Sequence, residues 1–173
     1  MRITYYVAAS LDGFIATSDG GVDWLVDSGI SMEDTNYDEF SASIDGIIVG
    51  RKTYEQTLGF GPWPFGDKPT WVCSSKEVEI ATGCDFRGVM TAREAVNQAR
   101  DAGLKHLWLL GGANLAATML KERLLTHVSV ATMPIVLGKG IGLFSGLDAH
   151  HLLKLEDSKQ FEAGFVHHDY RVV

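Results

Sequence analysis

The sequence predicts an α/β fold with a mainly parallel central sheet, helices on both faces and an antiparallel pair of strands near the C-terminus. Three observations lead to this prediction. Apolar runs alternate with helical patterns through residue 123, an order that favours strand–helix–strand units and a parallel sheet. Strands dominate after residue 123, and we expect the antiparallel pair among them. No low-complexity linker or internal repeat divides the 173 residues, so we expect one domain over 1–173.

Turn signals and apolar runs locate the elements of the first half of the chain. Residues 2–9 are rich in Tyr, Ile, Val and Ala, which is typical of a strand. Asp-Gly pairs at 12–13 and 19–20 are turn signals, so we expect a loop over residues 10–24. The expected order continues with a helix at 33–42, a strand at 46–50, a helix that begins over 52–58, a loop through Pro62, Pro64 and Gly66, and a strand at 69–74.

The clearest helical pattern in the chain covers residues 91–103. Thr91 and Glu94 form a capping box at its start, alanine and valine recur along one face, and Gly103 is expected to end it. Further apolar runs and a second helical pattern complete the chain. We expect a strand at 106–110, a helix at 113–123, and strands at 127–138, 151–156 and 161–172.

The composition excludes several classes of function. A net charge of −7 argues against a nucleic-acid or anionic-membrane partner, because both need a basic surface. No apolar run reaches the roughly 20 residues that cross a bilayer, and residues 1–15 lack the plan of a signal peptide. Two cysteines are too few for a disulfide framework, so we expect a cytoplasmic protein. No metal site is expected, because the vicinal histidine pairs lack zinc-ligand spacing.

Two glycine turns follow apolar strands and lead into helices. Residues 106–115, HLWLLGGANL, end an apolar run in two glycines and pass straight into a helical pattern. Residues 50–53, GRKT, follow a second apolar run in the same way. A helix N-terminus after a glycine turn is a binding site for phosphate. Two such sites in one small chain predict a ligand with more than one phosphate, and a dinucleotide fits that description.

Six motifs carry a resemblance to a known family and keep that family's order. They are SLDGFIA at 10–16, VGRKTYE at 49–55, WVCSS at 71–75, LWLLGGANL at 107–115, LLTHV at 124–128 and PIVLGKGIGLF at 134–144. The chain resembles the dihydrofolate reductase superfamily and, within it, the riboflavin-biosynthesis reductase branch (RibD C-terminal domain). The resemblance implies a three-layer sandwich that binds NADPH and pairs as a homodimer. It also implies hydride transfer to a small heterocyclic or ribosylaminopyrimidine-type substrate, such as 5-amino-6-(5-phosphoribosylamino)uracil in riboflavin biosynthesis.

The resemblance assigns cofactor-binding residues at four places in the chain. Arg51 can grip phosphate oxygens as a fork, and the amides of the following helix can add donors. Two hydroxyls and an ammonium at 74–76 favour the 2′-phosphate of NADPH. Small side chains at the end of the first strand suit a flat nicotinamide ring. The expected cofactor-binding residues are Ala9, Ile15, Gly50, Arg51, Lys52, Thr53, Ser74, Ser75, Lys76, Gly111, Gly112, Ala113 and Asn114.

The resemblance also assigns catalytic and substrate-binding residues. Asp34 matches a pocket carboxylate, and a carboxylic acid there would supply the proton that a C=N acceptor gains with the hydride; Asp38 is the alternate. The same acidic run also suits an ordinary helix start, stabilised by the helix dipole. Thr126 matches a strand threonine that supports this carboxylate, and Trp24 matches a loop tryptophan near the pocket; both are equally compatible with simple packing. Gly138 is expected to shape the rim of the cofactor or substrate site.

Three alternatives stay open at this point. The chain carries no H-x-E with C-x-x-C signature of the deaminase often fused to this reductase, so a stand-alone reductase with another substrate is conceivable. A true dihydrofolate reductase would need a carboxylate at Asp34 or nearby to hold the pterin. A non-catalytic nucleotide-binding module would bind NADPH without oxidising it.

Overall fold

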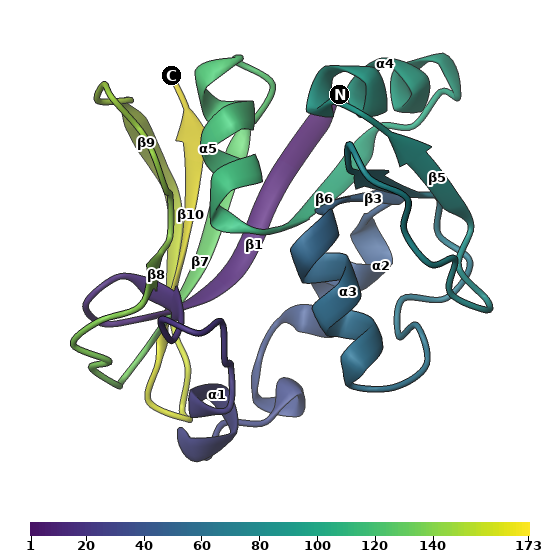
Figure 1. Cartoon of the computed structure of the whole chain (residues 1–173). Coiled ribbons are helices and arrows are strands. Elements are labelled where there is room, and N and C mark those ends of the chain that lie inside the picture. Colours follow the sequence, from purple (N-terminus) through teal and green to yellow (C-terminus); the bar gives the residue numbers. More distant parts are fainter.

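The computed structural model describes the backbone of residues 1–173 and every side chain except that of Met32. Its main element is an eight-stranded sheet, shown in Figure 1. In spatial order its strands are β5 (Phe86–Val89), β4 (Thr70–Cys73), β3 (Gly46–Gly50), β6 (His106–Gly111), β1 (Arg2–Ser10), β7 (His127–Met133), β10 (Val166–Val172) and β9 (Leu153–Gln160). Two short strands, β2 (Phe14–Ala16) and β8 (Ile141–Gly142), form a separate antiparallel pair.

The strand directions confirm the predicted fold class. From β5 to β7 every neighbouring pair of strands is parallel. β10 is antiparallel to both β7 and β9, which gives the expected antiparallel C-terminal pair. Parallel strands all end at the same edge of the sheet, so the segments that follow β1, β3, β4 and β6 meet there.

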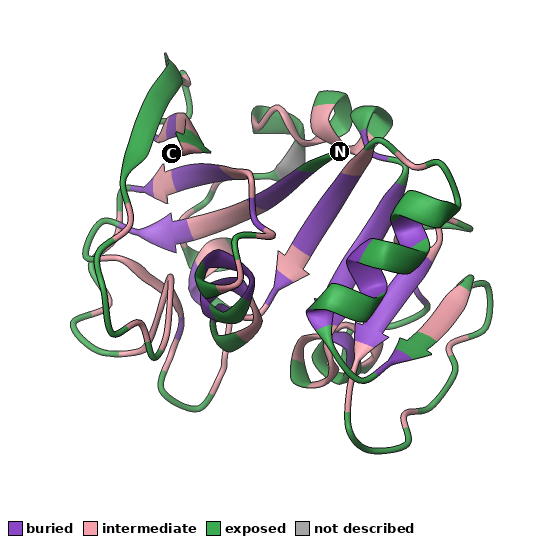
Figure 2. Cartoon of the chain, turned by 90° about the horizontal axis from the view of Figure 1, so that it is seen from above, coloured by how far each residue is buried: buried purple, intermediate pink, exposed green. Residues whose placement is uncertain are grey.

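Helices cover both faces of the sheet and complete three layers (Figures 1 and 2). Ile47 and Val49 of β3 pack with Tyr54 of α3 (Arg51–Gly59) on the face that also carries α2 (Tyr37–Ser43). Ile48, between them, packs on the opposite face with α4 (Ala92–Asp101) and with Met119 of α5 (Ala113–Lys121). This alternation follows from the two-residue repeat of a strand. A strand buried on both faces reads as a continuous apolar run, which is how β3 could be predicted.

The cap predicted for the clearest helix is confirmed at α4. The Glu94 amide donates to Thr91 Oγ1 over 3.1 Å, and the Glu94 carboxylate accepts from the Met90 amide over 3.1 Å. The first bond satisfies a backbone donor that a helix start leaves free. The second reaches the Met90 amide, one residue before the N-cap, and not the Thr91 amide that a full capping box uses. Among the described helices, none is long and apolar enough to cross a membrane.

Several predicted element boundaries were wrong. The expected loop over 10–24 contains β2 and the first residue of a short helix, α1 (Trp24–Asp27), and the expected helix at 33–42 is divided into a 3-10 turn (Met32–Asp34) and α2. β5 was missed because its sequence, FRGV, contains an arginine and a glycine and forms no apolar run. β7 ends at Met133, five residues early, because Pro134 has no N–H for the sheet. The last two strands begin later than expected, at Leu153 and Val166.

The contact between Gly140 and β2 gives a test of the small β2–β8 sheet. A Cβ at Gly140 would overlap the backbone oxygen of Ala16, whereas a Cβ at Gly59 would meet no atom within 4 Å. We therefore expect Gly140→Ala to lower the free energy of unfolding by about 1–3 kcal/mol, the usual cost of overpacking. Gly59→Ala is the matched control and should cause no loss. Chemical denaturation measures both, and equal effects of the two substitutions would contradict this account.

Candidate functional site

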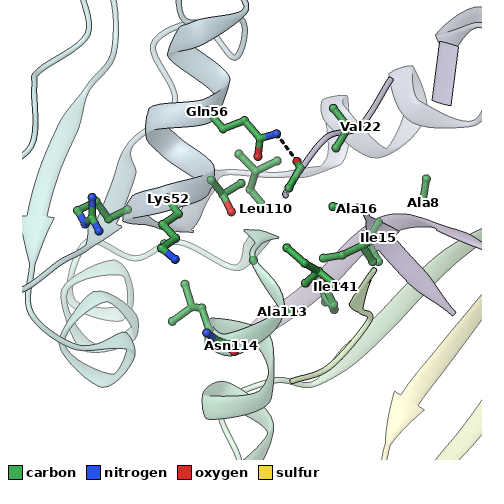
Figure 3. A pocket seen from close by; sticks show the side chains of 18 of the residues that line it. Ala8, Ile15, Ala16, Val22, Lys52, Gln56, Leu110, Ala113, Asn114 and Ile141 are labelled. Atoms are coloured by element: carbon green, nitrogen blue, oxygen red, sulfur yellow. Dashed lines mark hydrogen bonds between the residues drawn. The ribbon is translucent and has the colours of Figure 1, made fainter. Parts of the chain in front are cut away.

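A cleft of about 1450 Å³ opens at the carboxyl ends of β3, β4 and β6 and extends along the end of β1. Figure 3 shows Lys52 of α3 facing this space, Ala113 and Asn114 at the start of α5 beside it, and Ile15 and Ile141 on another side. Open α/β sheets bind ligands at the carboxyl ends of their strands. The cleft is therefore the candidate site.

Two helix N-termini border the cleft at the two predicted glycine turns. Gly50 is the N-cap of α3 and Gly112 is the N-cap of α5, and neither helix has a side-chain cap hydrogen bond. A Cβ at Gly50 would lie 3.5 Å from the carbonyl oxygen of Gly111, and a Cβ at Gly112 would lie 3.0 Å from Thr53 Oγ1. The two turns therefore touch, and their amides and helix dipoles converge on one space that suits anions.

The two cations of the cleft differ in their partners. Arg51 Nη1 donates to both carboxylate oxygens of Glu55, over 2.9 and 2.7 Å, one turn along α3. Lys52 forms no ion pair with any described side chain and extends into the cleft (Figure 3). Both residues were predicted to bind phosphate. The Lys52 ammonium has no ion pair to break before it binds an anion. Arg51 would have to give up its exposed ion pair with Glu55 to bind a phosphate, and this costs little free energy because such surface pairs are weak.

The polar turn after β4 reaches the cleft through two of its three predicted residues. Ser74 and Ser75 line the cleft, but Lys76 does not. Ser74 Oγ donates to the Lys76 carbonyl over 2.7 Å and accepts from the Lys76 amide over 3.0 Å. The Ser74 hydroxyl thus stabilises its own turn, and Ser75 is the side chain that this turn leaves for a ligand.

The end of β1 presents Ala8 to the cleft, one residue before the predicted Ala9. Ala9 is 3% exposed and packs in the core on the α4 and α5 face, because neighbouring strand residues point to opposite faces. Ile15 lines the cleft as predicted, and Ile141 joins it from β8. Antiparallel pairing of β2 with β8 holds these two isoleucines together.

The Asp12 carboxylate ties the segment after β1 to the glycine loop around Gly138. It accepts hydrogen bonds from Ser10 Oγ (2.6 Å), the Leu137 amide (3.1 Å) and the Gly138 amide (2.7 Å). The bond from Ser10 is the main cause of the lowered pKa of Asp12. The carboxylate is therefore ionised at neutral pH, and these contacts are lost only as the pH falls through that lowered pKa. Gly138 lies outside the lining of the cleft and contributes through this bond.

An aromatic wall lines part of the cleft, and it was not predicted. We use this name for Tyr6, Tyr37, Phe65 and Trp108, all of which line the cleft. The ring centroids of Trp108 lie 6.3 Å from Tyr6, 5.9 Å from Tyr37 and 4.9 Å from Phe65. One sequence signal could have found part of this wall, since Tyr6 lies two residues before Ala8 and faces the same side of β1.

The predicted catalytic carboxylates do not line the cleft. Asp34 is exposed, and its carboxylate accepts from the amide and the hydroxyl of Ser31, each over 2.8 Å. These bonds lower the pKa of Asp34, the opposite of what a proton donor at neutral pH requires. Asp38 is exposed on α2 and is also absent from the lining. The interpretation as an acidic start of a helical segment accounts for both residues.

Thr126 and Trp24 also lie apart from the cleft. The Thr126 hydroxyl donates to the carbonyl of Ile3 over 3.0 Å and accepts from its amide over 2.8 Å, near the beginning of β1. This is the opposite end of the sheet from the cleft, and Thr126 is absent from the lining of the cleft. Trp24 is 4% exposed and packs with Phe165, while its neighbour Leu25 lines the cleft. Thr126 thus links backbone segments by hydrogen bonds, and Trp24 packs in the core.

A polar cluster on the neighbouring strands β7 and β10 has the residue types of a hydrolase triad. Ser129 Oγ lies 2.7 Å from His167 Nε2 and 2.5 Å from Asp169 Oδ1. In a hydrolase triad the carboxylate contacts the other ring nitrogen of the histidine. His167 Nδ1 is buried and has no hydrogen-bond partner among the described atoms, so this arrangement is not a triad.

Comparison with known proteins places the chain in a family. A family model described as the RibD C-terminal domain matches residues 63–167. The uncharacterised protein YwjB of Bacillus subtilis (strain 168) is 34% identical over 166 residues, which cover 92% of each chain. A putative riboflavin biosynthesis protein from Shewanella sp. PV-4 superposes with a TM-score of 0.87 at 26% identity, over 100% of this chain and 99% of that one.

Two more distant structures share the fold. One is a diaminohydroxyphosphoribosylaminopyrimidine deaminase/5-amino-6-(5-phosphoribosylamino)uracil reductase from Thermotoga maritima, with a TM-score of 0.75 and 14% identity over 99% of this chain and 56% of that one. The other is the dihydrofolate reductase of Enterococcus faecalis complexed with NADP(H) and RAB-propyl, with a TM-score of 0.64 and 15% identity over 99% and 96% of the two chains. The sandwich is therefore of the dihydrofolate reductase type, and the chain belongs to the RibD C-terminal domain family.

Proposed function

We propose that this chain is an NADPH-dependent reductase that transfers a hydride to a small heterocyclic substrate. One observation carries the proposal: two helix N-termini without side-chain caps, at Gly50 and Gly112, open on the same cleft as the aromatic wall. The two helix N-termini suit a ligand with several phosphates, and the aromatic wall suits a flat ring. The family membership supports a reductase.

The residues around the glycine turns fit the charges of a dinucleotide. The first-turn amides of α3 and α5, the Thr53 hydroxyl and the Lys52 ammonium supply donors for a pyrophosphate. Arg51 and Ser75 are the donors that we assign to the 2′-phosphate. NADPH held in this way would supply the hydride, and the β2–β8 pair with Ala8 gives the cleft an apolar wall beside which the nicotinamide ring would lie. The proposed cofactor-binding residues are Ile15, Gly50, Arg51, Lys52, Thr53, Ser74, Ser75, Gly112, Ala113 and Asn114.

The reaction named for the Thermotoga maritima relative supplies the first compound to test, 5-amino-6-(5-phosphoribosylamino)uracil. Riboflavin biosynthesis is thus the finer form of the proposal. A true dihydrofolate reductase is disfavoured, because Asp34 and Asp38 are exposed outside the cleft. Asp19 is the one carboxylate among the described lining residues, and it accepts a hydrogen bond from Thr17 within its own turn.

A homodimer is part of the proposal. β9 is the edge strand of the main sheet, and all its residues from Leu153 to Gln160 are exposed. An exposed edge presents unpaired backbone groups that a second copy of the strand can pair.

The proposal predicts tight binding of NADPH and weaker binding of NADH. The two cofactors differ by the 2′-phosphate, and one charge-assisted hydrogen bond to that group is worth about tenfold or more in affinity. Tryptophan fluorescence titration of the wild-type protein measures both dissociation constants. Binding of neither cofactor would overturn the proposed function. Binding of both with no oxidation of NADPH by any heterocyclic substrate would favour the non-catalytic module.

Substituting each of the two cations in turn tests which phosphate of the cofactor it binds. Arg51→Ala should raise the dissociation constant of NADPH about tenfold and leave that of NADH unchanged, whereas Lys52→Ala should weaken both. Lys105→Ala is the control, because Lys105 is exposed before the beginning of β6, far from the cleft. Equal losses of NADPH and NADH in Arg51→Ala would remove Arg51 from the 2′-phosphate.

The exposed position of Asp34, away from the lining of the cleft, gives a further prediction. Asp34→Asn should leave kcat/KM for the reductase reaction unchanged, because the carboxylate is exposed and bonded only within its own turn. Steady-state oxidation of NADPH, followed by its absorbance, measures this. A large loss of kcat with unchanged NADPH affinity would restore Asp34 as the proton donor.

A further inference from the structure

The aromatic wall lines the same cleft as the glycine turns, and none of its residues belongs to those turns. Its four rings come from β1, α2, the segment after α3, and β6, and they meet edge to face or tilted. Phe40, stacked on Tyr6 with centroids 4.1 Å apart, supports the wall from behind. Aromatic side chains arranged in this way offer faces and edges to another planar ring.

Two of the three polar side-chain atoms of the wall have hydrogen-bond partners inside the protein. Trp108 Nε1 donates to the carbonyl of Tyr6 over 3.1 Å, and the Tyr6 hydroxyl donates to Asn36 Oδ1 over 3.0 Å. Burial raises the pKa of Tyr6 to about 12, so its phenol stays neutral. The wall therefore presents a largely apolar surface, and it carries no charge at neutral pH.

The formally charged residues that line the cleft are not part of the aromatic wall. Among the described lining residues they are Asp19, Arg51 and Lys52. Arg51 and Lys52 are both in the first turn of α3, beside the glycine turns. Asp19 is negative and would repel an anion. A phosphate group on the substrate would thus find no cation of its own once the cofactor phosphates have engaged α3.

We propose that the substrate is an uncharged, planar heteroaromatic ring without a phosphate group. This inference rests on the proposed reductase function, and within it an unphosphorylated ring replaces the phosphorylated compound named for the Thermotoga maritima relative. Moving a phosphate from water to a site without a cationic partner is costly, whereas burying a flat neutral ring against aromatic side chains is favourable. In the reaction, the carbon of one C=N or C=O bond gains the hydride of NADPH, the nitrogen or oxygen gains a proton from water, and NADPH becomes NADP⁺.

Matched pairs of ligands test the inference. The probes are 5-amino-6-(ribosylamino)uracil with its 5′-phosphate, and riboflavin with its 5′-phosphate, each titrated by tryptophan fluorescence with the wild-type protein saturated with NADP⁺. We expect at least one neutral compound to bind, and each 5′-phosphate to bind no more tightly than its neutral partner. Binding of a 5′-phosphate about tenfold more tightly, the effect of one charge-assisted bond, would overturn the inference. So would the failure of both neutral compounds to bind.

Saturating the protein with NADP⁺ before the titration distinguishes a wrong substrate class from a wrong proposed function. If NADP⁺ does not bind, the proposed function fails. If NADP⁺ binds and the phosphorylated ligand is preferred, only the substrate class is wrong.

A charge introduced at Val22 tests where the ring lies. Val22 lines the cleft on the side away from Lys52 (Figure 3), and Val26, in α1, is 81% exposed outside the cleft. Val22→Lys should improve binding of the 5′-phosphates about tenfold relative to the neutral partners, because it supplies the missing cation. Val26→Lys adds the same charge nearby and should not change the ratio. An unchanged ratio in Val22→Lys, or the same gain in both variants, would overturn the inference.

Discussion

The close approach of β3 and β6 at the carboxyl edge of the sheet is the constraint on which the site depends. A Cβ at Gly50 would lie 3.5 Å from the Gly111 carbonyl oxygen, and Gly111 itself has a φ of +127°, which side-chain-bearing residues rarely adopt. Because the strand ends meet, α3 and α5 begin beside each other and point their amides at one space. A Cβ at Gly112 would lie 3.0 Å from Thr53 Oγ1, so a side chain there would displace the Thr53 side chain or move the start of α5 away from the start of α3. A ligand with adjacent phosphates needs both helix N-termini close together.

The wall that faces these helices is built from a different kind of contact. β2 and β8 form a pair of only a few residues, which is weak by itself. The Asp12 carboxylate adds bonds to the amides of Leu137 and Gly138, and thereby fixes the loop that leads into β8. Ile15 and Ile141 reach the cleft only as long as this pair holds. A glycine at 140 is needed because the Ala16 backbone occupies the space of a side chain there.

The features that could be predicted from sequence are those with a local signal. β3 and β6 are continuous apolar runs, α4 has its cap and periodicity, and the glycine turns follow directly from their strands. The aromatic wall has no such signal, because Phe65 and Trp108 are far apart in the chain and meet only through the sheet order. Asp34 was matched to a pocket carboxylate on the expected helix at 33–42, whereas the structure divides that helix and places Asp34 in an exposed 3-10 turn. The predicted Ala9 directly follows Ala8, the residue that faces the cleft, and Ala9 therefore lies on the opposite face of β1.

The distribution of charge gives the cleft two chemically distinct ends. The protein carries a net charge of −7, yet the cations that line the cleft lie together at the start of α3. A negative protein repels anions at long range, so anion binding depends on short-range donors. The amides of two helices and the Lys52 ammonium provide such donors for the cofactor, whose several phosphates can use all of them together. The aromatic end has no equivalent, so a phosphorylated substrate would face both the repulsion and an unpaired buried charge, and a neutral ring would face neither.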